Sequence, residues 1–302
     1  MKRQNKHHKP LSGYQLVFNL LAYSLLTILS VACVLPFLII LAGSFTDNAS
    51  IIKDGYSLWP KVFSTQAYAT IFRNPADILQ AYGVTIFCTV VGTALGLFMT
   101  ALAGYALSRK SFTARNKISF LIYFTTIFGG GLVPWYFMIA SVLHLKGTLT
   151  ALWMPGLTSP FLIILMRTFI QESIPDEITE AANIDGAGHA TIFSKIVLPV
   201  LKPGLATGGL FLALGYWNDW YRSSLFSDDS KTWELQYYLY NMINRNEALR
   251  SLASQANIQI RNLPSETVKL AMTIVVTGPI LLLYPFVQRY FVSGITVGAV
   301  KG

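Results

Sequence analysis

Residues 216–220 place three aromatic rings beside an amide and a carboxylate, in the order Tyr216, Trp217, Asn218, Asp219 and Trp220. Aromatic faces bind the C–H surfaces of sugars, while a few polar groups fix orientation through hydrogen bonds. Trp135 and Tyr136, which follow the stretch FGGGLVP, offer a second pair of rings. These aromatic and polar residues are our candidates for a substrate path.

The sequence contains no pattern that is typical of catalysis. It lacks G-x-x-x-x-G-K-[ST], and it has no Gly-Lys dipeptide, so a Walker A phosphate loop is excluded. H-E-x-x-H, C-x-x-C and G-x-S-x-G are absent as well. The two cysteines, Cys33 and Cys88, lie far apart in apolar runs and define neither a metal site nor a disulfide framework. We expect no enzyme activity, no metal and no cofactor bound by this chain.

The elements that must position these residues are apolar helices. The chain has 302 residues, is 53% hydrophobic and only 12% charged, whereas soluble domains carry about 25% charge. A helix needs about 20 apolar residues to cross a hydrocarbon core of about 30 Å. Six segments meet this length: about 16–41, 81–107, 117–142, 150–170, 204–226 and 267–291. We therefore expect an all-α polytopic membrane protein with a basic tail (1–15) and one transmembrane domain (16–302).

The positive charges predict the orientation of these spans. The net charge is +9, with basic residues gathered before the first span and in residues 108–116. Such clusters mark the cytoplasmic side, and they form no basic stripe with aromatics of the kind that binds nucleic acid. The expected cytoplasmic segments are 1–15, 108–116, 171–203 and 292–302, so both termini are cytoplasmic. The first apolar run is too long for a signal peptide and no A-x-A-like site follows it, so we expect it to stay uncleaved.

Several segments carry more local predictions. Asn74–Gly83 predicts a short helix that enters the second span. Trp233–Asn262, in the later outer segment, predicts two short helices. FGGGLVP (Phe128–Pro134) should break the third span. The second span has small residues at every fourth position, which allow close helix packing either within this chain or against a partner subunit. These residues are Gly92, Gly96, Thr100 and Gly104.

The fifth-span cluster keeps two interpretations. An acid at the centre of a span costs about 2.5–3.5 kcal/mol on insertion scales, so Asp219 should face a cavity or a partner. Alternatively, tryptophan and tyrosine gather at membrane interfaces, and the cluster would then anchor the outer boundary.

The segment between the fourth and fifth spans reads as two short helices joined by a turn. Ser173 is a candidate N-cap, and Pro175 suits the first helical position. Asp185-Gly186 should turn the chain, and the second helix should stop before Pro199.

The stretch EAANIDGAGHATIFSKIVLPVLKP resembles the EAA loop of binding-protein-dependent ABC importer permeases. The matching positions are Glu180, Ala181, Ala182, Asp185, Gly186, Ala187, Phe193, Ile196, Leu198, Pro199 and Pro203. The resemblance implies that this loop forms coupling helices that dock into a cleft on a cytoplasmic ATPase. Gly188-His189 departs from the Ser/Thr–aromatic pair that is common there, which concerns only local docking.

Two further stretches resemble one branch of that family. GYWNDWYRSSLF (Gly215–Phe226) is similar to the fifth span of maltose-type, MalG-like carbohydrate permeases, and Tyr284–Gly302 is similar to the C-terminus of the complex-oligosaccharide subgroup. The resemblance implies a type I importer permease fold in a bacterial cell membrane. It also implies a second homologous permease, two ATPase subunits that hold ATP and Mg, an extracytoplasmic solute-binding protein, a sugar substrate and surrounding lipid.

Three rival functions were weighed. A permease for amino acids or peptides fits the loop but not the fifth span or the C-terminus. An ion-coupled secondary transporter predicts a relay of charges in the membrane and inverted repeats, which the sequence lacks. A membrane-embedded enzyme lacks a catalytic constellation. Residues alone name neither the sugar nor the partner chains.

Overall fold

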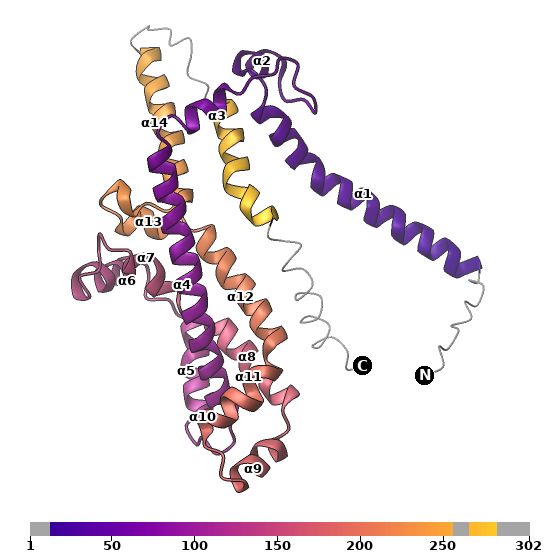
Figure 1. The fold of residues 1–302 in the computed structure, drawn as a ribbon, viewed down its shortest axis with the longest axis vertical. Helices are drawn as coiled ribbons and strands as arrows, with labels where there is room; N and C mark the ends of the chain where they lie inside the picture. Colours follow the sequence, from indigo (N-terminus) through magenta and orange to yellow (C-terminus); the bar gives the residue numbers. More distant parts are fainter. Residues whose placement is uncertain (1–12, 256–265, 283–302) are drawn as a thin grey trace. The chain divides into compact units, whose positions relative to one another are not determined.

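The computed structural model describes residues 13–255 and 266–282, and within them the chain is helical, with one isolated β-bridge between Thr46 and Phe63 (Figure 1). The all-α prediction is confirmed. Contacts divide the chain into two compact units, residues 1–70 with 261–275, and residues 71–260 with 276–302. The predicted basic tail (up to residue 12) and the C-terminal stretch from residue 283 lie outside the described residues.

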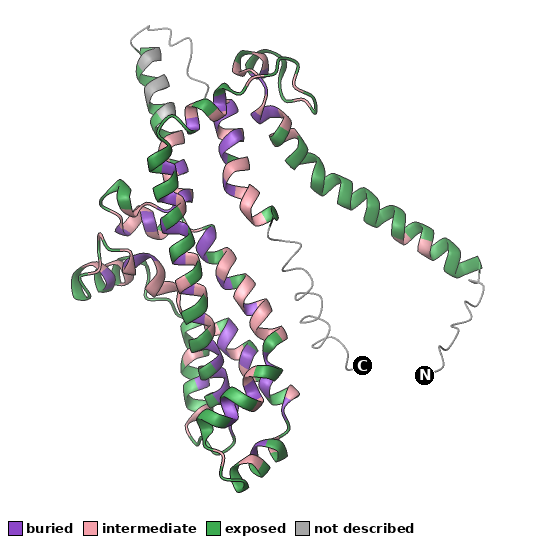
Figure 2. Ribbon diagram, viewed as in Figure 1, coloured by how far each residue is buried: buried purple, intermediate pink, exposed green. Residues whose placement is uncertain are grey.

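The first unit is built on one long apolar helix. Helix α1 (Gly13–Ser44) contains no charged residue, and none of its most apolar window is buried (Figure 2). Such a surface is stable only against lipid or another apolar partner. Two short helices follow, α2 (Asn48–Asp54) and α3 (Gln66–Ile71).

Helix N-termini in this first unit are capped by side chains. Asp47 accepts a hydrogen bond from the Ala49 amide at 3.0 Å and caps α2. The amide oxygen of Asn48 accepts from the backbone N–H groups of Glu266 and Thr267, at 3.2 and 3.4 Å. Asn48 thus caps the helix over residues 266–282, satisfying amides that lack a partner inside their own helix.

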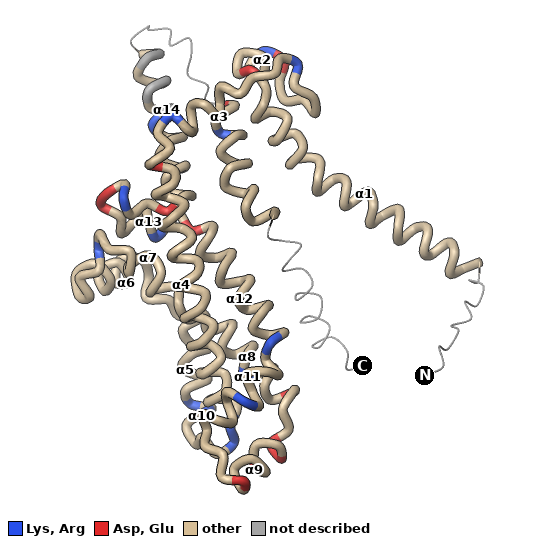
Figure 3. Tube along the Cα trace, viewed as in Figure 1, with Lys and Arg blue, Asp and Glu red and all other residues tan. Residues whose placement is uncertain are grey.

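The second unit is organised around helix α4 (Pro75–Ser108). Helices α8 (Pro160–Ser173) and α12 (Lys202–Trp217) pack along it (Figure 1). In α4 and α12 charge is confined to the first turn, because α4 carries only Asp77 and α12 only Lys202, whereas α8 carries Arg167 near its middle (Figure 3).

Helix α14 and a series of shorter elements make up the rest of this unit. They are α5 (Arg115–Ile127), α6 (Leu132–Phe137), the π-helix η1 (Met138–Val142), α7 (Thr150–Trp153), the 3-10 turn η2 (Met154–Gly156), α9 (Asp176–Ile184), α10 (His189–Ile192), the π-helix η3 (Phe193–Val197), α11 (Leu198–Val200), α13 (Tyr221–Phe226), the 3-10 turn η4 (Ser230–Thr232) and α14 (Leu235–Gln255).

The small residues of α4 let its neighbours approach. A Cβ on Gly92 would lie 2.3 Å from the Tyr216 ring of α12, and one on Gly104 would lie 2.9 Å from Met166 of α8. These contacts are far shorter than carbon atoms tolerate. The stripe therefore packs within this chain, as the first of the two interpretations predicted.

The spans are less regular than the sequence predicted. Of the described helices, only α1 and α4 are long and apolar enough to cross a membrane alone, and three bent pairs pass if each counts as one span. The pair over residues 115–142 bends by 114° across Gly129–Gly131, where the sequence predicted a break. The last predicted span is described only to residue 282, and six spans remain a prediction.

One prediction about the outer segments is wrong. Residues 75–83 are helical and enter the second span as predicted, where they form the first turns of α4. Trp233–Asn262 does not form two short helices among its described residues, because α14 runs unbroken for 21 residues. No proline or positive-φ glycine interrupts α14.

Candidate functional site

The loop that resembles a coupling loop starts with helix α9. Pro175 is its N-cap residue, and Asp176 and Glu177 fill the first turn, where negative charge is favoured by the helix dipole. Ser173 is not the N-cap that the sequence predicted, since it ends α8. The reason is the proline, which disfavours a helical conformation at Ile174 and puts it in extended backbone (φ −127°).

One face of α9 is open. Thr179 is buried, whereas Glu180 and Ala181 are exposed and Ala182 is half-buried. The exposed residues of α9 combine the carboxylates of Glu177 and Glu180 with the small Ala181 and two isoleucines, Ile178 (47% exposed) and Ile184 (86% exposed). No described atom of this chain covers this free face.

Gly186 forms the turn after α9. Its φ is +80°, in the left-handed region, and a Cβ there would meet nothing within 4 Å. The Gly186 amide donates to Asn183 O at 3.0 Å, and the Ala187 amide donates to Ala182 O at 2.9 Å. These bonds close the end of α9, and they depend on the backbone conformation that glycine adopts most readily. The predicted turn at Asp185-Gly186 is confirmed.

The second half of the loop is anchored in the core. Residues 189–200 form one helical rod from α10, η3 and α11. Its apolar side joins a buried cluster with α4 and α8. The fully enclosed members are Ala101, Tyr105, Met166, Ile170, Ile174, Ile192, Phe193, Val197 and Leu201. Ala182, Ala187, Ile196 and Leu198 pack against this cluster.

The predicted stop before Pro199 is wrong. The helical rod continues through Pro199, which lies in the first positions of α11. A proline is tolerated there because its missing N–H is not needed at the start of a helical segment. The rod ends instead at Leu201, where the axis bends by 79° into α12 and Pro203 occupies the first turn.

Of the fifth-span candidates, two are fixed by contacts inside the unit. Trp217 is buried and its indole N–H donates to Val276 O at 3.2 Å. Asp219 caps α13 by accepting from the amides of Tyr221 (2.9 Å) and Arg222 (3.1 Å), and it forms an ion pair with the Arg222 guanidinium. The sequence predicted that Asp219 faces a cavity or a partner. In the structure its partner is Arg222, three residues later.

Arg222 is itself enclosed. Its guanidinium carbon lies 4.8 Å from the centre of the Tyr216 ring, and the Tyr216 hydroxyl donates to Trp153 O at 2.7 Å. These contacts therefore join α12, α13 and α7 at one end of this unit. Trp135 and Tyr136 are also packed, because both rings lie against Phe226, at 5.1 and 5.7 Å between centroids.

Asn218 and Trp220 differ from these residues because they remain accessible. Trp220 is 43% exposed and stacks on Tyr240 of α14 at 5.0 Å between centroids. Tyr240 is 46% exposed and stacks in turn on Tyr237. Asn218 accepts a hydrogen bond from the Gln236 amide at 3.3 Å.

This accessible surface, formed by Asn218, Trp220, Gln236, Tyr237 and Tyr240, is called the aromatic platform below. It offers ring faces beside amide groups, the combination that suits sugars. Tyr237 and Tyr240 were missed in the sequence. Their spacing of three residues in α14 is the signal that places both on one helix face. Trp233 precedes this helix, and its ring lies 5.3 Å from that of Tyr237 between centroids.

Glu234 is a buried acid beside the platform. Its carboxylate accepts from Ser223 Oγ at 2.8 Å, and its amide donates to the same oxygen at 3.2 Å. Burial raises the pKa of Glu234 to about 8, helped by the charge of Asp219, while the Ser223 hydrogen bond and Arg222 oppose the shift. Glu234 therefore keeps its proton near neutral pH.

Glu234→Gln should remove a pH dependence of stability. The folded pKa (about 8) exceeds the ordinary value of 4.5, so the free energy of unfolding falls as pH rises between these values and levels off above the higher one. The slope approaches about 1.4 kcal/mol per pH unit at most. Melting temperatures of the purified protein between these limits should decline less in the variant. Glu177→Gln, at an exposed carboxylate, should behave like the unsubstituted chain, and parallel curves for all three proteins would contradict the assignment.

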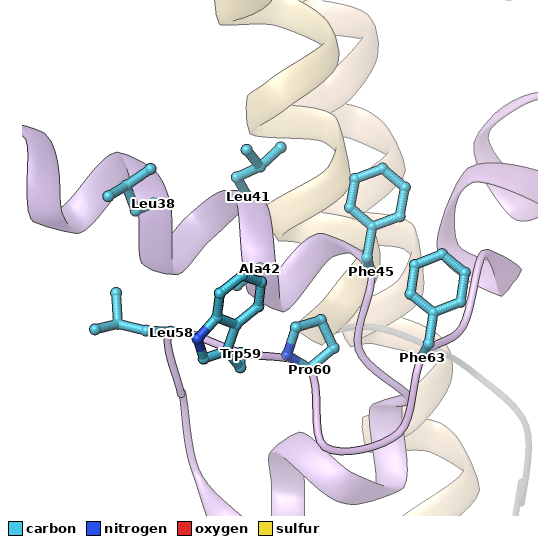
Figure 4. Close-up of a pocket in the computed structure, with 8 residues that line it drawn as sticks. All are labelled: Leu38, Leu41, Ala42, Phe45, Leu58, Trp59, Pro60 and Phe63. Atoms are coloured by element: carbon cyan, nitrogen blue, oxygen red, sulfur yellow. The ribbon is translucent and has the colours of Figure 1, made fainter.

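A groove in the first unit is apolar. It has a volume of about 700 Å³ and lies between the end of α1 and residues 58–63 (Figure 4). Its lining residues are Leu38, Leu41, Ala42, Phe45, Leu58, Trp59, Pro60 and Phe63. The indole N–H of Trp59 is the single side-chain polar group, so the groove lacks the hydrogen-bonding groups that would orient a sugar. Over residues 13–255 and 266–282, no three His, Cys, Asp or Glu side chains gather to hold a metal ion.

The long apolar helices define an integral membrane protein, and comparison with known proteins narrows this class. No family model matches the chain. Protein LplC of Bacillus subtilis is 38% identical over 271 residues, which cover 89% of this chain and 90% of that protein. The polygalacturonan/rhamnogalacturonan transport system permease protein YtcP of the same species is 36% identical over 286 residues, covering 95% and 99%.

The solved structures give the same answer. The crystal structure of a bacterial ABC transporter involved in the import of the acidic polysaccharide alginate matches with a TM-score of 0.78 and 28% identity, covering 94% of this chain and 99% of that chain. The chain belongs to the permease subunits of oligosaccharide ABC importers. The rival reading as an amino-acid or peptide permease is not supported.

Proposed function

We propose that this chain forms one half of the translocation path in an ATP-driven importer and pairs with a second, homologous permease. Two separate ATPase subunits would bind ATP and Mg, and an extracytoplasmic solute-binding protein would deliver the sugar. The observation that carries this proposal is the loop over residues 173–203, whose α9 face is free while its α10–α11 rod is fixed in the core.

The coupling residues divide between these two halves. Glu180 and Ala181 present the free face of α9 to the ATPase, and Gly186 sets the angle between the halves. Phe193 anchors the rod: its ring lies 5.5 Å from that of Tyr105 in α4. A displacement of the docked helix then reaches α4 through direct contact. Asp185, Ala182, Ala187 and Pro199 shape the loop rather than contact the partner.

An oligosaccharide is the proposed substrate, and an acidic one is the first to test. Two of the similar proteins are named for the transport of polygalacturonan or rhamnogalacturonan and for the import of alginate, an acidic polysaccharide. Others are named for arabinooligosaccharides and maltodextrin, so neutral chains are the comparison.

The aromatic platform is the proposed sugar-contacting surface of this chain. Trp220 and Tyr240 offer exposed ring faces, and Asn218 and Gln236 offer amides beside them. The other candidates, Trp135, Tyr136, Trp217 and Asp219, support the surface through packing and pairing.

Deleting the gene should abolish uptake of the transported oligosaccharide, measured with labelled oligogalacturonides and maltodextrins. Trp220→Ala should restore only slow uptake, because one stacking face is lost, while the complex still assembles. Trp59→Ala, at a tryptophan in the apolar groove that is even more exposed (84% against 43%), serves as the control and should restore normal uptake. Normal uptake in Trp220→Ala would remove the platform from the path, and unchanged uptake after deletion would refute transport itself.

The termini and the coupling loop are proposed to be cytoplasmic. Single cysteines at Asn5 and Thr113 should resist an impermeant thiol reagent in intact cells, and one at Ser230 should react, after Cys33 and Cys88 are replaced. Thr113 and Ser230 are exposed, so protection reports the side of the membrane and not burial. Labelling of Asn5 or Thr113 with protection of Ser230 would reverse the orientation.

A further inference from the structure

A polar pocket lies at the C-terminal end of the apolar helix α4. It has a volume of about 340 Å³ and is bounded by the end of α4 and the junction between α8 and α9. Arg109, Lys110, Gln171 and Asp176 supply its charged and amide groups. The pocket shares no residue with the aromatic platform, and its residues are not among the coupling positions named above.

Arg109 is the buried cation of this pocket. The residue is only 8% exposed, and its Nε donates to Ser108 Oγ at 3.2 Å. Its guanidinium carbon lies 5.0 Å from the centre of the Tyr105 ring. The Nη1 nitrogen is enclosed and has no hydrogen-bond partner in the part of the chain that the structure describes. A guanidinium does not lose its charge, so a donor enclosed in this way calls for an acceptor.

The charges around the pocket leave a positive excess. Lys110 forms an ion pair with Asp176 at 2.6 Å. The hydrogen bond from Lys110 lowers the pKa of Asp176, and the charges of Arg109 and Arg115 add to that effect. Asp176 is therefore ionised and shared among several cations. An anion entering the pocket would meet Arg109 and the free N–H groups of Lys110.

The position of the pocket favours one kind of anion. Arg109 follows α4 by one residue, and α4 is long and apolar enough to cross a membrane. Phosphate groups lie at this level in a bilayer, and phosphate is an acceptor whose geometry suits the guanidinium fork. We propose that this pocket binds a phosphate group through Arg109 and Lys110, supplied either by a lipid headgroup or by a free phosphate.

Such binding would act at the start of the coupling loop, to which Ile174, Pro175 and Asp176 of the pocket belong. Lys110 already holds Asp176, the first residue of α9. A phosphate shared by Arg109 and Lys110 would add a second tie between the end of α4 and the start of α9. That regulatory consequence rests on the proposed function, whereas the binding site itself does not.

Chemical acetylation of Lys110 reports whether the pocket is occupied. The complete importer is placed in phosphatidylcholine nanodiscs, treated with an amine-reactive acetylating reagent, and digested for mass spectrometry. Lys110 is 75% exposed at its side chain, so it reacts when the pocket is empty. Lys146, which pairs with Asp228 at 2.9 Å elsewhere in the unit, is the internal control.

We expect a several-fold fall in acetylation of Lys110, but not of Lys146, when phosphate is supplied. If inorganic phosphate protects Lys110 and potassium chloride of equal ionic strength does not, a free phosphate suffices. If only nanodiscs containing phosphatidylglycerol protect it, the ligand is a lipid headgroup. Arg109→Gln should abolish either protection, and Arg109→Lys should restore part of it.

Absence of protection under both conditions would overturn the proposal, as would equal protection of Lys146. The unsubstituted protein decides this outcome even if the Arg109 variants fail to assemble. Because the readout is modification of one lysine and not transport, a negative result leaves the importer function intact. Loss of that function would appear instead in the uptake measurements.

Discussion

Gly186→Val should leave the permease in the membrane but abolish most transport. Valine at φ +80° places its Cβ against its own backbone, at a cost of about 1–2 kcal/mol or more. The surroundings are open, so the strain cannot be blamed on a neighbouring side chain. The turn should relax to another conformation, and α9 would then point away from its docking position. Uptake and substrate-stimulated ATP hydrolysis by the reconstituted importer should both fall at least about tenfold, the ratio that 1.4 kcal/mol produces.

Gly188→Val is the matched control for this experiment. Gly188 lies two residues away in the same loop, also in open space, but its φ is −70°. Valine accepts that conformation readily, so this variant should retain coupling. Full stimulation in Gly186→Val, or equal losses in both variants, would show that the turn conformation does not set the coupling geometry.

Gly92→Ala should destabilise the whole second unit. The added Cβ would lie 2.3 Å from the Tyr216 ring, which is held by its hydrogen bond to Trp153 O and by Arg222 above it. Overpacking of this kind costs about 1–3 kcal/mol, against a gain of about 1 kcal/mol in helix propensity. The purified protein should melt at a lower temperature and give a lower folded yield.

Gly83→Ala separates these two effects. Gly83 lies in the same helix α4, but a Cβ there would meet nothing within 4 Å. This variant gains helix propensity alone and should be as stable as the unsubstituted chain or slightly more stable. If the Gly92→Ala protein had the same melting temperature as the Gly83→Ala protein, the close approach of α4 and α12 would be disproved.

Local backbone chemistry accounts for what could be predicted from sequence. Asp185-Gly186 predicted a turn because the Asp-Gly pair favours one. The glycines of α4 predicted close helix packing because they recur on one helix face. The wrong helix ends, at Ser173 and Pro199, share a cause. Both depended on which of several adjacent residues takes the cap position, and neighbouring prolines decide this through small steric differences.

Long-range contacts account for what could not be predicted. Asn48 caps a helix that begins more than 200 residues later, and no periodicity in either segment reveals it. Asp219 was recognised as an acid that needs a partner, yet the arginine three residues on was not weighed as that partner, although the spacing suits a helix turn. The platform tyrosines were placed in a helix, but their stacking on Trp220 depends on how α13 and α14 meet.

The bend at Leu201 has a mechanical consequence. The rod over residues 189–200 meets α12 at 79°, close to a right angle, so a push along the rod has almost no component along the axis of α12. If the loop couples to an ATPase as proposed, a thrust along the rod would tilt α12 sideways and would not shift it along its own axis. Sideways tilting keeps the apolar length of α12 at its depth in the bilayer, whereas piston motion would drag Lys202 into hydrocarbon.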